Sequence, residues 1–108
     1  MKIKDYPQAV YYFQKTVDNA HKAKDYRFIK GFYENLVDAQ LETNLVDAKK
    51  SLDIGATYEM TDATGEKAVI DYAYLLQYAN YYLKVKNYKL SETYANQTLE
   101  GAFLIKHS

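Results

Sequence analysis

Cysteine and tryptophan are absent from this chain of 108 residues, and proline occurs only once. The lack of cysteine excludes a disulfide framework, thiol chemistry and a cysteine metal site. No apolar run approaches the roughly 18 residues that indicate a membrane span. The first residues, MKIKDYPQ, also lack the apolar core of a signal peptide. We therefore expect a cytoplasmic protein with no membrane partner.

An excess of charge of one sign is also missing, since 14 Lys and Arg residues balance 14 Asp and Glu residues. A neutral chain has no overall field to attract nucleic acid or an anionic membrane. No helix-turn-helix pattern is visible either, so we expect no direct binding of nucleic acid. Tyrosine, in contrast, occurs 13 times, so much of the apolar surface carries a hydroxyl that needs water or a partner.

Helical periodicity is clearest between Tyr72 and Leu99. The first stripe, at spacings of three and four, consists of Leu75, Tyr78, Ala79 and Tyr82. After a break at residues 84–87, a second stripe consists of Tyr88, Ser91, Ala95, Thr98 and Leu99. Two amphipathic helices joined by so few residues are expected to fold back as an antiparallel hairpin.

Similar stripes along the rest of the chain predict an all-α fold in one domain spanning residues 1–108. The expected helices cover residues 5–23, 25–43, 45–59, 66–84 and 87–104. Asp5 is the expected N-cap of the first helix, with Pro7 in its first turn. Gly31 lies inside the second helix, where glycine costs about 1 kcal/mol relative to alanine. We therefore expect a neighbouring helix to approach closely at Gly31.

One signal occurs three times, as Asp5-Tyr6-x-x-Ala9, Asn44-Leu45-x-x-Ala48 and Asn87-Tyr88-x-x-Ser91. Each copy has a capping residue, a bulky residue and a small contact residue. Together with the stripes of the last hairpin, these copies resemble the tetratricopeptide repeat (TPR). The resemblance implies TPR-like antiparallel helix hairpins that form a fragment of an α-α superhelix. The alternative is an ordinary five-helix bundle whose stripes happen to align.

The segments YFQKTVDNAHKAKDYRFIKGFYENL and YANYYLKVKNYKLSETYANQTL look like the TPR sensor arrays of peptide-pheromone-responsive transcriptional regulators of Gram-positive bacteria. The resemblance implies a signalling module that binds a peptide or protein segment as part of such a regulator. Two complete repeats bury little surface, so the chain is expected to be a fragment of a longer array or a homodimer. A self-associating scaffold or oligomerisation domain without a separate ligand is the alternative function.

The resemblance also implies a peptide-binding concave face lined by the first helix of each hairpin. From the second and fourth helices of the chain, the residues expected there are Lys30, Tyr33, Glu34, Val37, Gln40, Leu76, Gln77, Asn80, Leu83 and Lys84. An amide side chain can donate to one backbone group and accept from another, which suits Asn80 to hold an extended peptide. Lys84, one turn further on, can pair with a terminal carboxylate.

Enzymatic chemistry is not expected, because no nucleophile motif, glycine-rich phosphate loop or HExxH motif occurs in the sequence. We also expect no cofactor and no bound metal. Asp18, His21 and Asp25 share one predicted helix face and provide the weak alternative of a metal site, although no fourth ligand is in sight.

Overall fold

The computed structural model describes residues 5–58 and 72–107, with side chains described for 5–58 and 74–99. The described chain is all-α, as predicted, and no strand occurs in these two ranges. Its helices are α1 (Tyr6–Ala23), α2 (Ile29–Gln40), α3 (Leu45–Gly55), α4 (Tyr72–Lys84) and α5 (Tyr88–His107). The chain divides into two compact units, Met1–Tyr58 and Glu59–Ser108. The expected single domain stays a prediction.

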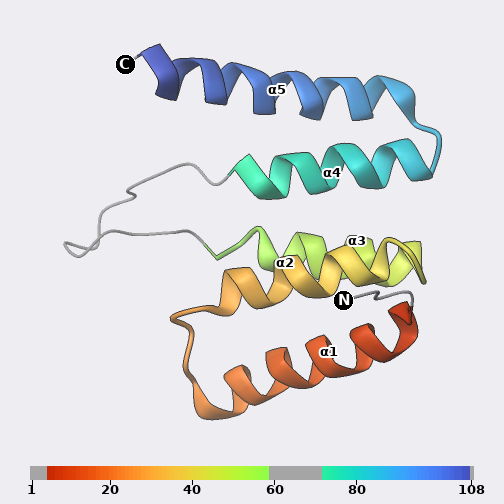
Figure 1. Cartoon of the computed structure of the whole chain (residues 1–108), viewed down its shortest axis with the longest axis vertical. Helices are drawn as coiled ribbons and strands as arrows, with labels where there is room; N and C mark the ends of the chain where they lie inside the picture. Colours follow the sequence, from red (N-terminus) through yellow and green to blue (C-terminus); the bar gives the residue numbers. More distant parts are fainter. Residues whose placement is uncertain (1–4, 59–71, 108) are drawn as a thin grey trace. The chain divides into compact units, whose positions relative to one another are not determined.

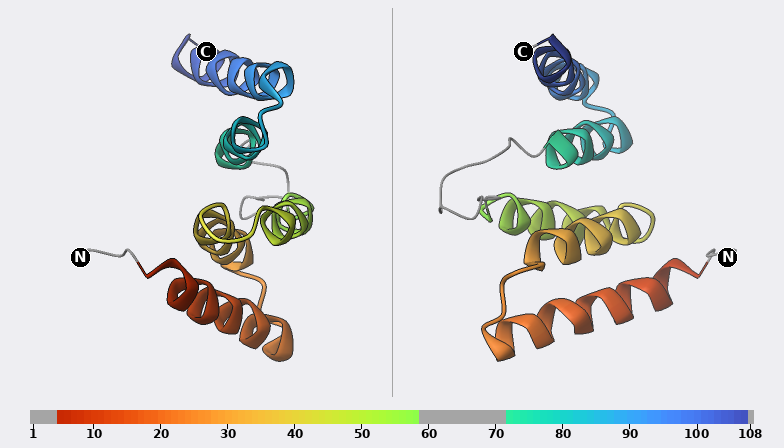
Figure 2. Two further views of the ribbon diagram at one scale, coloured as in Figure 1. Left: turned by 90° about the vertical axis from the view of Figure 1, so that its right-hand side faces the viewer. Right: turned by 60° about the vertical axis from the view of Figure 1, so that its left-hand side comes forward.

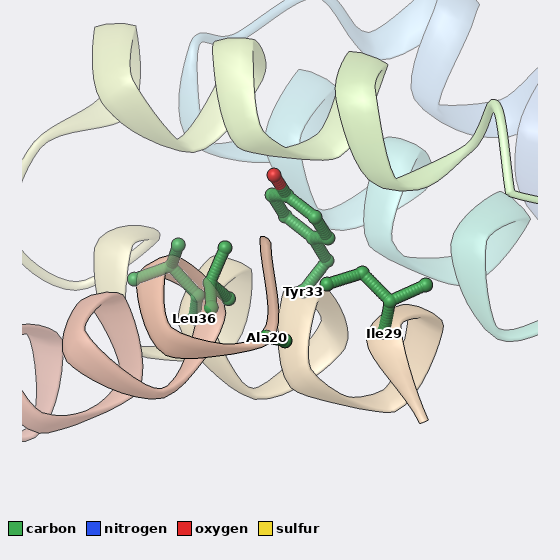
Figure 3. Packing of buried hydrophobic residues seen from close by; sticks show 5 residues of the cluster. Ala20, Ile29, Tyr33 and Leu36 are labelled. Carbon is green, nitrogen blue, oxygen red and sulfur yellow. The ribbon is translucent and has the colours of Figure 1, made fainter. Parts of the chain in front are cut away.

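In the first unit, α1, α2 and α3 follow one another as antiparallel helices (Figure 1). The middle helix, α2, contacts both α1 and α3. The hydrophobic core consists of Val17, Ala20, Ile29, Tyr33 and Leu36, with Val10, Phe13, Phe32 and Tyr58 packed against it. Figure 3 shows the side chain of Tyr33 extending from α2 toward α3. The apolar stripe of α1 is therefore buried against α2, while α2 buries side chains on two sides.

The second unit contains the predicted hairpin, in which α4 and α5 lie side by side and antiparallel (Figure 2). Leu75 and Ala79 are its buried apolar side chains on α4. Within residues 5–58 and 72–107, no helix has the length and apolar character needed to cross a membrane.

All three copies of the predicted capping signal start helices. The carboxylate of Asp5 accepts a hydrogen bond from Gln8 N at 3.1 Å. In the same way, the Asn44 side chain accepts from Asp47 N at 3.1 Å and Asn87 accepts from Leu90 N at 3.3 Å. Such bonds satisfy an amide that has no partner within the helix. The expected position of Pro7 in the first turn of α1 is also confirmed.

The α1–α2 and α4–α5 connections share a turn that the sequence patterns above did not single out. Lys24 and Lys86 both have left-handed backbone, with φ of 52° and 65°. The next amide of each turn closes a bond five residues back, from Asp25 N to Ala20 O at 3.0 Å and from Asn87 N to Tyr82 O at 2.8 Å. This is the Schellman arrangement, with lysine where glycine is most common. The sequences KAKDY and KVKNY thus form the same turn.

Two helix boundaries differ from the sequence expectation by four residues, and the second and fifth helices end three residues from the expected positions, at Gln40 and His107. The second helix begins at Ile29 instead of residue 25, because residues 24–28 form a turn in which Asp25 is bonded to both the backbone N and the guanidinium of Arg27. The third helix ends at Gly55 instead of residue 59, and the Thr57 hydroxyl donates to Ile54 O at 2.6 Å just beyond it. The expected helical residues 66–71 lie outside the described residues.

The expectation of a close helix approach at Gly31 was wrong. A Cβ atom added at this exposed glycine would meet no atom within 4 Å. The close approach occurs instead at Gly55 of α3, where an added Cβ would lie 2.8 Å from the Cβ of Tyr33. Gly55 therefore lets α3 pack directly on α2.

Candidate functional site

The α4 helix carries four of the predicted peptide-binding residues on its exposed surface. Leu76 and Leu83 are 50% and 53% exposed, and Asn80 and Lys84 are also exposed. Positions 76, 80 and 83 are spaced by four and three, which places them on one face of the helix. We call Leu76, Asn80 and Leu83 the α4 outer face. The fifth predicted residue on this helix, Gln77, is buried.

The α4 outer face is turned outward by the way that α4 packs on α5. The Ser91 hydroxyl of α5 donates to the backbone carbonyl of Ala79 at 2.8 Å, so two small residues meet where the helices touch. Beside this contact, the Tyr94 ring stacks on Tyr78 and Tyr82 with centroid distances of 5.1 and 5.6 Å. Ala79, Tyr78 and Tyr82 thus occupy the α5 side of the helix, and the outer face lies away from it.

The predicted residues of α2 are placed differently. Tyr33, Val37 and Gln40 are buried, and the expectation that these side chains are exposed was therefore wrong. The reason is that α2 packs between α1 and α3 and retains little open surface. Lys30 and Glu34 are half-buried. Any role of these five residues in peptide binding stays a prediction.

Lys30 and Tyr33 instead connect α2 to α3. The Lys30 ammonium donates to the carbonyl of Gly55 at 3.3 Å, which caps the end of α3 with a positive charge. The Tyr33 Cβ lies where Gly55 leaves room for it. The structure thus gives these two residues a role in packing.

An aromatic cluster of His21, Tyr26, Tyr33 and Tyr58 joins four segments of the first unit. The Tyr58 ring is stacked between Tyr26 and Tyr33, with centroid distances of 6.1 and 5.9 Å. His21 Nε2 lies 2.8 Å from the Tyr33 hydroxyl. Burial raises the pKa of Tyr33, and the nearby Tyr58 and Asp18 raise it further. No sequence pattern connects Tyr33 with His21, because their contact depends on how α1 and α2 pack.

Gln40 has an unusual environment at the end of α2. Its side chain is 4% exposed, and its Oε1 atom has no hydrogen-bond partner in the structure. A buried acceptor without a partner lowers stability because it has lost its bonds to water. Among the described residues, no other buried side-chain nitrogen or oxygen atom lacks a hydrogen-bond partner.

The residues of the alternative metal site have other contacts. His21 faces Tyr33, and both carboxylate oxygens of Asp25 accept hydrogen bonds from Arg27, at 2.9 and 2.7 Å. This ion pair lowers the pKa of Asp25 from 3.8 to about 2, chiefly through the side-chain hydrogen bonds of Arg27. The described part of the chain contains no group of three or more His, Cys, Asp or Glu residues that could hold a metal ion.

Comparison with family models, with curated proteins and with solved structures gives no match. The α4 outer face therefore has to be interpreted from its own chemistry. It combines two exposed leucines with an amide between them, and a lysine follows at the end of the helix.

Proposed function

We propose that this chain is a TPR-like module that binds a peptide or protein segment along the α4 outer face. The observation that carries the proposal is the contact of Ser91 with the Ala79 carbonyl. It joins the two helices through small residues on one side of α4 and leaves Leu76, Asn80 and Leu83 available on another. Close contact through small residues is the arrangement that the TPR resemblance implies for a hairpin.

The chemistry of this face suits an extended peptide. The Asn80 amide can donate to a backbone carbonyl and accept from a backbone amide of the ligand. Leu76 and Leu83 lie about 10 Å apart along the helix axis, from the rise of 1.5 Å per residue. They provide apolar contact on either side of the amide. Lys84 can pair with the ligand's terminal carboxylate.

In this proposal the module is the sensor or interaction part of a bacterial transcriptional regulator, as the resemblance implies. The partner is a peptide or protein segment, and no catalytic reaction is assigned to the chain. The concave face that α2 and α4 were expected to line together is not needed, because the residues that bind the peptide in this proposal all come from α4.

A displayed library of random heptapeptides with free C-termini tests the proposal. We expect selected peptides to bind the whole chain in calorimetry, and Asn80→Ala to weaken them about tenfold, the equivalent of about 1.4 kcal/mol. Lys84→Ala is expected to weaken peptides with a free carboxylate and to leave their amidated forms unchanged. Thr93→Ala, at an exposed site on α5, is the matched control. Affinities that are the same for Asn80→Ala, Lys84→Ala and the wild type would refute this binding face.

Self-association is a second candidate function, favoured by exposed aromatic rings on α1. Tyr11 and Tyr12 are 60% and 55% exposed, with ring centroids 5.3 Å apart. Tyrosine rings with this exposure are frequent in interfaces between proteins. Sedimentation over a wide concentration range is the test, and we expect Tyr12→Ala to weaken any dimer. A monomer at every concentration would exclude this candidate.

A further inference from the structure

The α5 helix exposes a second line of large side chains, separate from the α4 outer face. Tyr88 is 62% exposed and Leu99 is 68% exposed, and Glu92 is exposed between them. At 3.6 residues per turn, these three positions fall within a narrow arc of the helix. Ser91 and Tyr94, which contact α4, lie outside this arc. We call Tyr88, Glu92 and Leu99 the α5 outer face.

The shared turn shows what this face corresponds to in the first unit. Counting onward from Lys24 and from Lys86 pairs residues 26–37 with residues 88–99, because the same Schellman turn precedes both segments. In this count α2, which begins at Ile29, starts three residues later than α5, which begins at Tyr88. The paired positions of interest are Tyr26 with Tyr88, Lys30 with Glu92, and Val37 with Leu99. The α5 outer face is thus the counterpart of Tyr26, in the turn before α2, and of Lys30 and Val37 on α2.

In the first unit, α3 covers that face. Val37 is 1% exposed, whereas its counterpart Leu99 is 68% exposed. Lys30 donates to the carbonyl of Gly55 at the end of α3. Tyr26 stacks on Tyr58, which follows α3. Lys30 and Tyr26 therefore have a partner on α3 or just after it. Val37 is buried on the face of α2 that α3 contacts.

We propose that the α5 outer face is a docking site for an amphipathic helix of another polypeptide that has the contact chemistry of α3. Such a helix has small residues where it meets α5, like the buried Ala48, Ser51 and Gly55 of α3, and an aromatic residue at its C-terminal end to stack on Tyr88. Because Glu92 replaces Lys30, the partner also needs a basic side chain near that end.

A second copy of the chain is a poorer occupant than a separate helix. Its α3 is already packed on α2 through its small residues. The exposed faces of its other helices carry large side chains, such as Tyr11 and Tyr12 on α1 and Leu76 and Leu83 on α4. Gly31 is an exposed small residue of α2, but its neighbours on that face are the polar Asn35 and Asp38.

The test uses the whole chain, labelled with ¹⁵N, and an amidated synthetic peptide with the sequence of residues 44–58. We expect the peptide to shift amide signals of α5 and not those of α2. Glu92→Lys restores the lysine of α2 and is expected to tighten binding of this peptide about threefold. Leu99→Glu is expected to weaken it about tenfold, and Tyr88→Ala, at the other end of the face, is expected to weaken it as well. Each fold-change follows from the ratio of dissociation constants.

Leu90→Glu is the matched control, because Leu90 is also an exposed leucine of α5 but lies on the opposite side of the helix. Leu83→Glu on the α4 outer face should also leave this peptide's affinity unchanged, which separates the inference from the proposed function. Equal affinities of the Leu99→Glu and Leu90→Glu chains would overturn the docking site. Amide signal shifts confined to α2, or no binding of the peptide to the wild type and to any variant, would also overturn the docking site. A wild-type dimer that Leu99→Glu dissociates would identify a second copy as the occupant and overturn the choice of partner.

Discussion

The α1–α2 and α4–α5 hairpins are closed by the same turn, yet they are packed with different side chains. In the first hairpin, Val17 and Ile29 are 1% and 2% exposed and belong to the hydrophobic core. Their counterparts in the second hairpin are Ala79 and Ser91, which are joined by a hydrogen bond at 2.8 Å. Beside this contact the Tyr94 ring stacks on Tyr78 and Tyr82. The positions that correspond to Tyr78 and Tyr82 in the first hairpin are the smaller Thr16 and Ala20.

This difference shows that the turn and the interior of a hairpin are separate properties. The turn needs only a residue that tolerates left-handed backbone, followed by a residue that caps the next segment. The number of sides on which a helix buries side chains depends on how many helices it contacts. Because α3 covers α2, the first hairpin buries side chains on two sides, whereas Leu99 and Tyr88 of the second remain exposed.

The sharpest way to test the contrast is to truncate matched positions in the two interiors. Leu36 is 1% exposed, and its counterpart Thr98 is only partly buried. Leu36→Ala should lower the free energy of unfolding of the first unit by about 2–5 kcal/mol, because a buried side chain is replaced by a cavity. Thr98→Ala should cost the second unit less than about 1 kcal/mol. Urea unfolding followed by NMR at residues of each unit measures both, and similar losses would contradict the contrast.

The two glycines provide a second comparison, between a packed and an open position. Gly55→Ala should lower the free energy of unfolding of the first unit by about 1–3 kcal/mol, because the new methyl group overlaps the Cβ of Tyr33. Gly31→Ala should raise it by up to about 1 kcal/mol, since alanine favours the helix and nothing lies nearby. Thermal unfolding of both variants is the measurement. Two changes of the same sign would show that α3 does not pack on α2 as described.

Because the two hairpins share a turn, replacing its left-handed lysine by glycine should change the free energy of unfolding equally in both. Lys24→Gly and Lys86→Gly should each raise the free energy of unfolding by about 1 kcal/mol, because glycine adopts left-handed backbone without the steric cost of a Cβ atom. Chemical denaturation of the two variants measures these gains. Lys22→Gly, inside the last turn of α1, is the control and should destabilise. A gain in only one hairpin would mean that the two turns are not equivalent.

The smallest expected effect is a change in the pKa of Asp25. This residue is the one polar difference between the two turns, because the second turn has Asn87 in its place. The pKa of Asp25 should be about 2, and Arg27→Ala should return it toward 3.8 because the main cause of the shift is removed. A lowered carboxylate pKa stabilises the folded chain at pH values above 3.8, and this contribution is lost as the pH falls toward 2. Side-chain carbonyl NMR during an acid titration measures the value. A midpoint near 3.8 in the wild type would show that the ion pair does not form in solution.

The sequence predicted the parts of the fold that depend on neighbouring residues. The caps at Asp5, Asn44 and Asn87 are confirmed because each bond joins residues three positions apart. Leu76, Asn80 and Leu83, which the sequence pointed to as binding residues, are exposed on α4, and their binding role stays a prediction. On α2 the same reasoning failed, because a periodic pattern does not reveal how many neighbouring helices a helix has. Tyr33 and Val37 therefore appeared free for a ligand although they are buried.

By itself, the sequence determined an all-α chain, its caps and its breaks, since backbone hydrogen bonding and helical periodicity act over a few residues. Tertiary structure decided which glycine is a contact point, that His21 meets Tyr33, and that Val37 is covered while Leu99 is not. These outcomes depend on which surfaces meet when helices pack. Residues that are distant in the sequence then compete for the same space, and no local pattern records the result.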